Sequence, residues 1–298
     1  MNTHGAPDRV KIVEVGPRDG LQNEPRVVDT PTKIAFINRL SATGLTAIEV
    51  TSFVHPTSIP QLADAEAVVR GITRRAGVTY SALVPNLRGL ERALSVGVDA
   101  IAVFTAASET FNQRNIHCST EGSLSRFIPV LARAKSVDIP VRGYISCALG
   151  CPYEGEIKPR QVASLAERLY AMGCAEISLG DTIGVGTPLQ AQALVNTVAA
   201  VVPIERLAVH FHDTHGRALA NIRACLKLGV SIIDASVAGL GGCPYAPGAP
   251  GNVATEAVVA MLEDMGIATG IDLDKLGEAG RFIKENGKWG STTLNRSE

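Results

Sequence analysis

Short runs of apolar residues alternate with amphipathic stretches along the whole chain. The runs are nearly continuous in apolar and β-branched side chains, which is typical of strands buried in a parallel sheet. We expect eight such strands, at Lys11–Val15, Ala47–Ser52, Thr79–Val84, Ala100–Thr105, Val141–Ser146, Glu176–Gly180, Leu207–His212 and Ile232–Val237. The stretches between them place apolar residues at helical spacing. We expect helices near Pro31–Ala42, Gln61–Gly71, Leu87–Ser95, Thr120–Ser136, Pro159–Met172, Pro188–Ala200, Arg217–Leu228 and Val253–Met265.

Prolines and glycines mark the ends of several expected helices. Pro31, Pro159 and Pro188 stand in a first helical turn, where the missing amide hydrogen of proline costs nothing. Glycine is favoured just after a helix, where the chain often turns through a left-handed conformation. Glycines follow four of the expected helices, at Gly44, Gly97, Gly173 and Gly229.

Eight strands that are each followed by a helix predict an α/β fold of the TIM-barrel type, a (β/α)8 barrel. A doubly wound open sheet is the alternative, but no G-x-G-x-x-G motif follows the first strand. We expect one domain over residues 1–298, with the barrel at about 10–266 and a C-terminal extension at 267–298. The extension should add a helix at Leu273–Asn286.

Composition narrows the class of protein. The chain has 298 residues, of which 46% are hydrophobic and 19% charged, and its net charge is −1. No long basic run is present, so we expect neither nucleic acid nor a membrane surface as a partner. The polar start of the chain lacks the apolar core of a signal peptide, and no apolar run is long enough for a membrane helix. The six scattered cysteines are then best interpreted as reduced thiols in a cytoplasmic protein.

Polar residues gather where the expected strands end, which is the functional face of such a barrel. These candidates are Arg18, Asp19, Gln22, Glu49, Ser52, Ser178, Asp181, His210, His212, Cys243 and Asn252. Because side chains alternate along a strand, His210 and His212 point to the same face. A lone H-x-H more often marks two hydrogen-bonded core histidines. With Asp19 it becomes a mixed oxygen and nitrogen set that suits Mg²⁺ or Mn²⁺ and leaves coordination positions open.

Two further side chains bring chemistry to this face. Arg18 cannot lose its proton, so it offers a fixed positive charge to an oxyanion, although it could equally form a structural ion pair with Glu49 or Asp19. Cys243 lies in a loop with five glycines between Gly239 and Gly251. An ordinary thiol is mostly protonated at pH 7 and can act as an acid, although a loop cysteine commonly has no function.

Six segments carry a family resemblance, at Val15–Glu24, Thr51–Phe53, Arg142–Gly155, Ser178–Pro188, His210–Thr214 and Gly239–Ala246. On these segments the chain resembles the 3-hydroxy-3-methylglutaryl-CoA lyase family, within the wider group of metal-dependent barrel lyases and Claisen-type synthases. The Arg-Asp pair and the H-x-H strand are shared by the wider group. The cysteine loop and the Ser-Cys-Ala-Leu-Gly-Cys stretch are specific to the lyases.

The resemblance implies cleavage of 3-hydroxy-3-methylglutaryl-CoA to acetyl-CoA and acetoacetate, a reaction of leucine catabolism and ketone-body formation. It implies a divalent cation, Mg²⁺ or Mn²⁺, held by Asp19, His210, His212 and Asn252. It further implies the following roles: an enolate partner at Arg18, a positioning carboxylate at Glu49, a loop acid at Cys243, and site-lining residues at Ser178 and Asp181. We also assign Gln22 and Ser52 to substrate binding, and we expect a homodimer that binds an acyl-CoA.

Three alternatives remain at this point. A lyase for a related branched 3-hydroxyglutaryl-CoA, such as an isohexenyl derivative, would differ only in pocket shape. A condensing enzyme of the same group would usually carry extra regulatory domains, for which this chain has no room. A barrel that only binds metal or CoA would lack a catalytic residue, and none of the expected residues is missing.

Overall fold

A computed structural model describes residues 5–24, 26–242 and 251–287. Within these residues, eight parallel strands pair in chain order and close into a barrel, because β1 pairs with β8. The strands are β1 Lys11–Glu14, β2 Ala47–Ser52, β3 Thr79–Leu83, β4 Ala100–Ala106, β5 Val141–Ser146, β6 Glu176–Asp181, β7 Leu207–Phe211 and β8 Ile232–Ala235. This confirms the predicted barrel, and each strand agrees with its expected position to within two residues.

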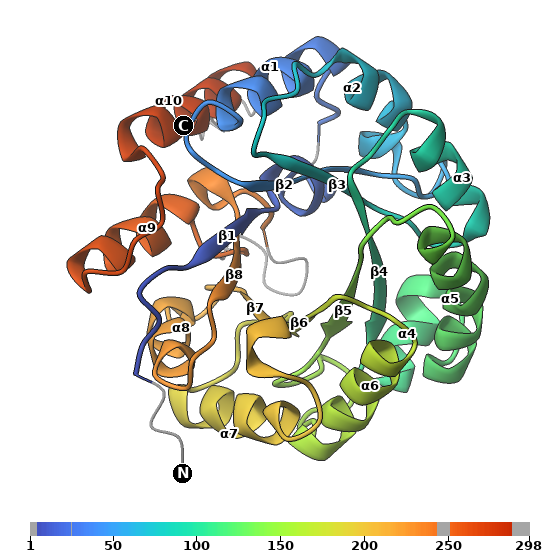
Figure 1. Ribbon diagram of the computed structural model, residues 1–298, viewed down its shortest axis with the longest axis vertical. Coiled ribbons are helices and arrows are strands. Elements are labelled where there is room, and N and C mark those ends of the chain that lie inside the picture. Colours follow the sequence, from blue (N-terminus) through green and yellow to red (C-terminus); the bar gives the residue numbers. More distant parts are fainter. Residues whose placement is uncertain (1–4, 25, 243–250, 288–298) are drawn as a thin grey trace, which may run out of the picture.

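Helices surround the barrel on the outside (Figure 1). They are α1 Thr30–Leu40, α2 Ala65–Gly71, α3 Leu87–Ser95, α4 Glu109–Ile116, α5 Thr120–Lys135, α6 Pro159–Ala171, α7 Pro188–Ala199, α8 Ala218–Leu226, α9 Thr255–Asp264 and α10 Leu273–Asn286. The main core lies between this layer and the strands, where Phe36, Ile48 and Val209 are fully buried. No helix in the described part of the chain is both long and apolar enough to cross a membrane.

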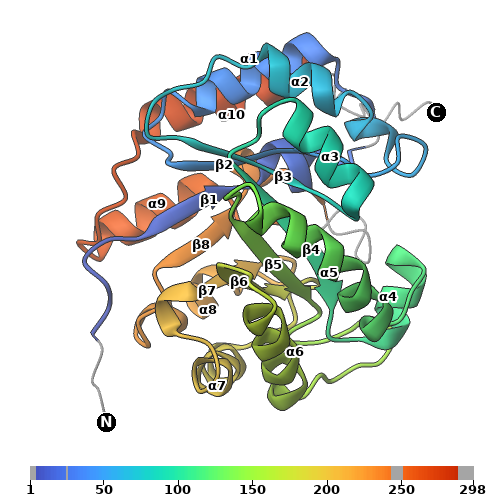
Figure 2. The ribbon, with the colours of Figure 1, turned by 45° about the vertical axis from the view of Figure 1, so that its right-hand side comes forward.

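The extra C-terminal helix α10 lies beside α1, as both views of the ribbon show (Figures 1 and 2). The guanidinium of Arg39 in α1 lies 4.4 Å from the ring centre of Phe282 in α10. The amide of Asp272 donates to the carbonyl oxygen of Thr43 at 2.7 Å. Gly44 has a φ of 95° in this connection, and a Cβ there would lie 2.1 Å from the Gly270 carbonyl oxygen. Only glycine fits this close approach, which confirms the predicted left-handed cap.

Two helices differ from the predicted ones. The expected helix over 61–71 begins instead with a short 3₁₀ turn, Pro60–Leu62, and α2 starts at Ala65. The helix α4 was not expected, because it is short and mostly polar and therefore shows no apolar period. Ser108 caps it by accepting from the amide of Phe111, and it ends at His117 in a left-handed conformation.

Charged side chains fill part of the barrel interior. Arg142 of β5 lies 2.7 Å from Asp234 of β8 and 3.4 Å from Glu176 of β6, and Glu176 also pairs with Lys11 of β1. Buried charges are stable only when they are paired, so this network links four strands through the barrel. It continues toward the carboxyl ends of the strands, where the predicted site lies.

Candidate functional site

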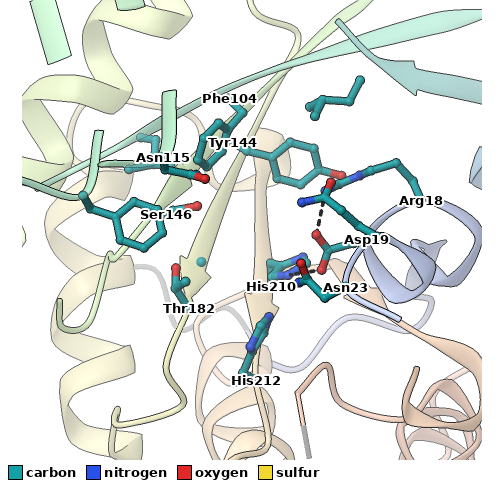
Figure 3. Close-up of a pocket in the computed structure, with 15 residues that line it drawn as sticks. Arg18, Asp19, Asn23, Phe104, Asn115, Tyr144, Ser146, Thr182, His210 and His212 are labelled. Carbon is teal, nitrogen blue, oxygen red and sulfur yellow. Dashed lines mark hydrogen bonds and ion pairs between the residues drawn. The ribbon is translucent and has the colours of Figure 1, made fainter. Parts of the chain in front are cut away.

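A cavity of about 180 Å³ opens at the carboxyl ends of the strands. Residues from the segment after β1, from β3, β4, β5, β6 and β7, and from α4 line it. Figure 3 shows Arg18 and Asp19 on one side and Asn115, Ser146 and Thr182 on the other. The predicted functional face of the barrel therefore carries a real cavity, and two segments far apart in the chain bring the predicted residues together there.

The turn η1, Gly16–Gly20, carries Arg18 and Asp19 to the cavity. The amides of Arg18, Asp19 and Gly20 all donate to the carbonyl oxygen of Val15, at 2.7–3.1 Å, so the chain coils tightly after β1. At Gly20 a Cβ would lie 2.8 Å from the Cβ of Leu240. Glycine is thus needed where this turn packs against the segment that follows β8.

Arg18 is buried between two carboxylates. Its Nε donates to Glu49 Oε2 at 2.7 Å, its Nη1 donates to Asp19 Oδ1 at 2.6 Å, and its guanidinium lies 5.4 Å from the ring centre of Tyr144. Burial alone would lower the pKa of Arg18, but Glu49 and Asp19 raise it above its usual value. Arg18 therefore forms the structural ion pair and lines the cavity at once, and its role toward an oxyanion stays a prediction.

His210 is oriented by a carboxylate behind it. Its Nδ1 lies 3.2 Å from Asp234 Oδ2, and its Nε2 lies 3.7 Å from Asp19 Oδ2. Because the ionised Asp234 carboxylate can only accept, Nδ1 donates to it, and Nε2 is left facing Asp19 in the cavity. Burial alone would lower the pKa of His210, but Asp234 and Asp19 raise it above its usual value. The site thus attracts positive charge, and Asp234 was not among the residues that the sequence indicated.

Asp19, His210 and His212 offer one ligand atom each, and these atoms all lie within 4.8 Å of one another. The Nδ1 of His212 is buried and has no hydrogen-bond partner. Burial, together with the neighbouring His210, lowers the pKa of His212 to about 4, so its ring is neutral at pH 7, the form that binds a metal. Burial would raise the pKa of Asp19, but Arg18 and the histidines hold it well below its usual range. This donor set fits one divalent cation.

Asn252 lies beside the same carboxylate. Its Nδ2 donates to Asp19 Oδ2 at 2.9 Å and to the Leu240 carbonyl oxygen at 3.2 Å, and its backbone bridges to His212. A metal ion would bind the side-chain oxygen of Asn252 and not this nitrogen. Rotating the side-chain amide by half a turn exchanges the positions of the two atoms. The position of Asn252 suits the predicted ligand role, which stays a prediction.

The other predicted residues divide into two groups. Gln22 lines the cavity, and Glu49 reaches it through Arg18. Ser52, Ser178 and Asp181 are buried and do not line it among the described residues. Ser178 donates to Asp234 at 2.9 Å, and Asp181 accepts from the amides of Val185 and Gly186, which fix the chain after β6. Their assignment to substrate contact stays a prediction, and here Ser178 and Asp181 support the wall of the site. Cys243 lies outside the described residues.

The structure adds cavity residues that the sequence reasoning did not name. They are Asn23, Leu83, Phe104, Phe111, Asn115, Tyr144, Ile145, Ser146, Gly180 and Thr182. Tyr144 donates to Glu49 Oε2 at 3.2 Å, and its ring meets that of His210 edge to face. Tyr144 and Ser146 alternate at the end of β5 as the two histidines do in β7, and this alternation was the signal that could have revealed them.

Comparisons with known proteins place this geometry in context. The HMGL-like family profile matches residues 9–283. A rat protein named 3-hydroxy-3-methylglutaryl-CoA lyase, cytoplasmic, is 57% identical over 279 residues, which are 94% of this chain and 81% of that protein. The human protein named hydroxymethylglutaryl-CoA lyase, mitochondrial, is 57% identical over 277 residues, which are 93% of this chain and 85% of that protein.

Solved structures agree with these sequence matches. A hydroxymethylglutaryl-CoA lyase from Pseudomonas aeruginosa superposes with a TM-score of 0.94 at 55% identity and covers 96% of this chain and 95% of its own. An HMG-CoA lyase from Acinetobacter baumannii, in complex with coenzyme A and 3-methylmalate, has a TM-score of 0.89 at 38% identity. It covers 98% of both chains.

Proposed function

Because the chain belongs to the HMGL-like family, we propose that it cleaves 3-hydroxy-3-methylglutaryl-CoA to acetyl-CoA and acetoacetate. The observation that carries this proposal is the juxtaposition of Asp19, His210 and His212 with the buried guanidinium of Arg18 in one cavity. A retro-Claisen cleavage needs a polarised hydroxyl and a fixed positive charge for an enolate, and this cavity supplies groups for both.

The reaction breaks the C2–C3 bond of the acyl group. The C3 hydroxyl loses its proton and becomes the ketone of acetoacetate, while the bonding electrons pass to C2 and form a thioester enolate. A proton on C2 then gives acetyl-CoA. Asp19, His210 and His212, with the amide oxygen of Asn252, would hold a Mg²⁺ or Mn²⁺ ion, which lowers the pKa of a bound hydroxyl.

The side chains of this chain supply the remaining functions. Arg18 stabilises the enolate, and Glu49 and Tyr144 hold its guanidinium in place. Asp19 or one of the two histidines accepts the hydroxyl proton. Cys243, which the family resemblance assigns as the acid, donates the proton to C2. Arg18 is buried, so its charge is shielded from water. Its attraction for the developing negative charge is therefore stronger than it would be in water.

The far side of the cavity suits the free carboxylate of this substrate. Asn115, Ser146 and Thr182 lie there, opposite Arg18 (Figure 3). Thr182 Oγ1 accepts a hydrogen bond from the amide of Cys147 at 2.8 Å, so the hydroxyl hydrogen of Thr182 is left to donate. The Cys147 sulfur is a nearby acceptor, but a substrate carboxylate is a stronger one.

Replacing Thr182 with valine should raise KM and leave kcat nearly unchanged. A hydrogen bond to a charged group contributes about 1.5–3 kcal/mol, so we expect KM to increase about 10–100-fold. Thr182→Ser keeps the hydroxyl and is the matched control, with KM near that of the wild type. Steady-state kinetics on both variants would test this, and an unchanged KM in Thr182→Val would remove Thr182 from the carboxylate subsite.

The proposed activity is tested directly by following acetyl-CoA release from 3-hydroxy-3-methylglutaryl-CoA after chelation and after adding back Mg²⁺ or Mn²⁺. We expect cation-dependent release of acetyl-CoA and acetoacetate in equal amounts. A parallel assay with an isohexenyl analogue should give a much lower kcat/KM. Higher kcat/KM for the analogue, or no cleavage of either compound with the cation bound, would contradict the proposal.

Three broader expectations belong to the same proposal. The activity resides in a single domain, the enzyme is a homodimer, and it acts in the cytoplasm, where the named rat relative is also placed. The named human relative is mitochondrial, so location has to be measured in the source cell. Light scattering coupled to gel filtration would give the mass of the assembly.

A further inference from the structure

Glu14 is a fully buried carboxylate that the proposed reaction does not use. It is the last residue of β1, and only Val15 separates it from the turn that carries Arg18 and Asp19. It forms no ion pair with any described residue. A nearby carboxylate, that of Glu256, raises its pKa further. Its position calls for an explanation other than charge pairing.

Three donors from three segments converge on this carboxylate. Oε1 accepts from the amide of Gly16 at 2.8 Å and from the amide of Val237 at 2.9 Å, and Oε2 accepts from the hydroxyl of Thr255 at 2.6 Å. Gly16 begins η1, Val237 begins the short turn after β8, and Thr255 begins α9. One side chain therefore ties the start of the barrel to its end.

These ties lie next to two predicted cation ligands. Asp19 is in the same five-residue turn as Gly16, and Asn252 closely precedes Thr255 in the chain. The two ligands meet directly, because Asn252 Nδ2 donates to Asp19 Oδ2 at 2.9 Å. The packing is also tight, since a Cβ at Gly16 would lie 2.6 Å from Glu14 Oε1.

Burying the Glu14 carboxylate to hold these segments costs folding free energy. Burial raises the pKa of Glu14 to about 7, against the opposing effect of its hydrogen bonds, because the ionised form is desolvated without a cation. The gain that offsets this cost is geometric: a single planar group accepts from all three segments at once, in addition to the backbone hydrogen bonds between β1 and β8 and between Ser236 and Thr255.

We propose that Glu14 is a positioning residue that holds the Arg18–Asp19 turn against the Asn252 segment and so sets the geometry of the cation site. This inference rests on the proposed function for its catalytic consequence. Its effect on cation binding is measured without an acyl-CoA, so it stands apart from the identity of the substrate.

The test is Mn²⁺ binding to the metal-free full-length protein, measured by calorimetry, alongside kcat and KM. Glu14→Ala loses all three contacts, and we expect Mn²⁺ affinity to fall about 10–100-fold, as changes to residues that orient metal ligands do. Glu14→Gln keeps an oxygen for the amides of Gly16 and Val237, so it should restore most of the affinity. A lower kcat in Glu14→Ala should follow at saturating Mn²⁺, with KM changed less.

Two controls separate positioning from a general loss of stability. Thr255→Val removes one contact and leaves the two backbone amides bound, so Mn²⁺ affinity should stay near that of the wild type. Tyr80→Phe removes a buried hydroxyl that accepts from the amide of Arg75 and donates to Ser41, close to the start of β3 and far from the cavity. It should reduce thermal stability without changing Mn²⁺ affinity.

Each outcome is decisive. Wild-type Mn²⁺ affinity in Glu14→Ala would overturn the proposal, as would a Glu14→Gln protein as weak as Glu14→Ala. If Glu14→Ala does not fold, Gly16→Ala takes its place, because the added Cβ pushes the turn away from Glu14, and unchanged affinity there would also overturn the proposal. Failure of the wild type to cleave 3-hydroxy-3-methylglutaryl-CoA, with the affinity pattern intact, would refute the proposed function and leave the role of Glu14 standing.

Discussion

Replacing His210 with alanine is expected to abolish turnover and to weaken divalent-cation binding by more than about 100-fold. Changes to residues that only orient metal ligands already weaken binding by about 10–100-fold, and His210 is proposed to be a ligand itself. The substitution also leaves Asp234 without the imidazole that its Oδ2 faces at 3.2 Å. Asp234 keeps Arg142 and the hydroxyl of Ser178 as partners, so the barrel should still fold.

Calorimetric titration of the metal-free protein with Mn²⁺ measures the affinity, and circular dichroism checks the fold. His55→Ala is the matched control, because His55 is exposed and its Nδ1 contacts only the hydroxyl and amide of neighbouring Thr57 among the described residues. It should bind Mn²⁺ like the wild type. A folded His210→Ala protein that binds Mn²⁺ with unchanged affinity would show that His210 is a hydrogen-bonded core residue and not a cation ligand.

The architecture was predictable because the apolar runs and the amphipathic stretches alternate without interruption. The strands of a buried parallel sheet are mostly apolar, and this leaves a strong local signal even in a short strand such as β8, which also carries the paired charge of Asp234. The helix α4 left no such signal, since only Phe111 and Asn112 are buried in its eight residues. It carries Phe111 and Asn115 into the cavity, so the part of the fold that was missed also contributes to the site.

The site was predictable where its residues share one strand or one turn. His210 lies in β7 and His212 directly follows that strand, and Arg18 and Asp19 are adjacent, so local geometry brings each pair to the cavity. Asp234 supports His210 from the neighbouring strand, and this depends on the register between β7 and β8. Periodicity does not fix that register, which is why Asp234 could not be named from the sequence.

Replacing Arg18 with glutamine is expected to reduce kcat by about 10²–10³-fold while KM changes little. Its guanidinium is proposed to meet negative charge that develops only as the C2–C3 bond breaks, and loss of one such donor has an effect of this size on kcat. The substitution also leaves Glu49 buried with Tyr144 but without its cation, which costs about 3–5 kcal/mol of stability when one partner of a buried pair is removed. Loss of activity could then follow from a disturbed fold.

The double variant Arg18→Gln/Glu49→Gln separates the two effects, because it removes both charges of the buried pair together. Urea unfolding should show that the double variant recovers much of the stability lost in Arg18→Gln, while kcat stays low because the positive charge is still absent. Arg18 also contacts the predicted cation ligand Asp19, at 2.6 Å. Mn²⁺ affinity measured on the same proteins therefore shows how much of the loss in kcat comes from weaker cation binding. A double variant that recovered kcat along with stability would show that Arg18 serves the fold alone, and a raised KM with kcat intact would limit Arg18 to substrate binding.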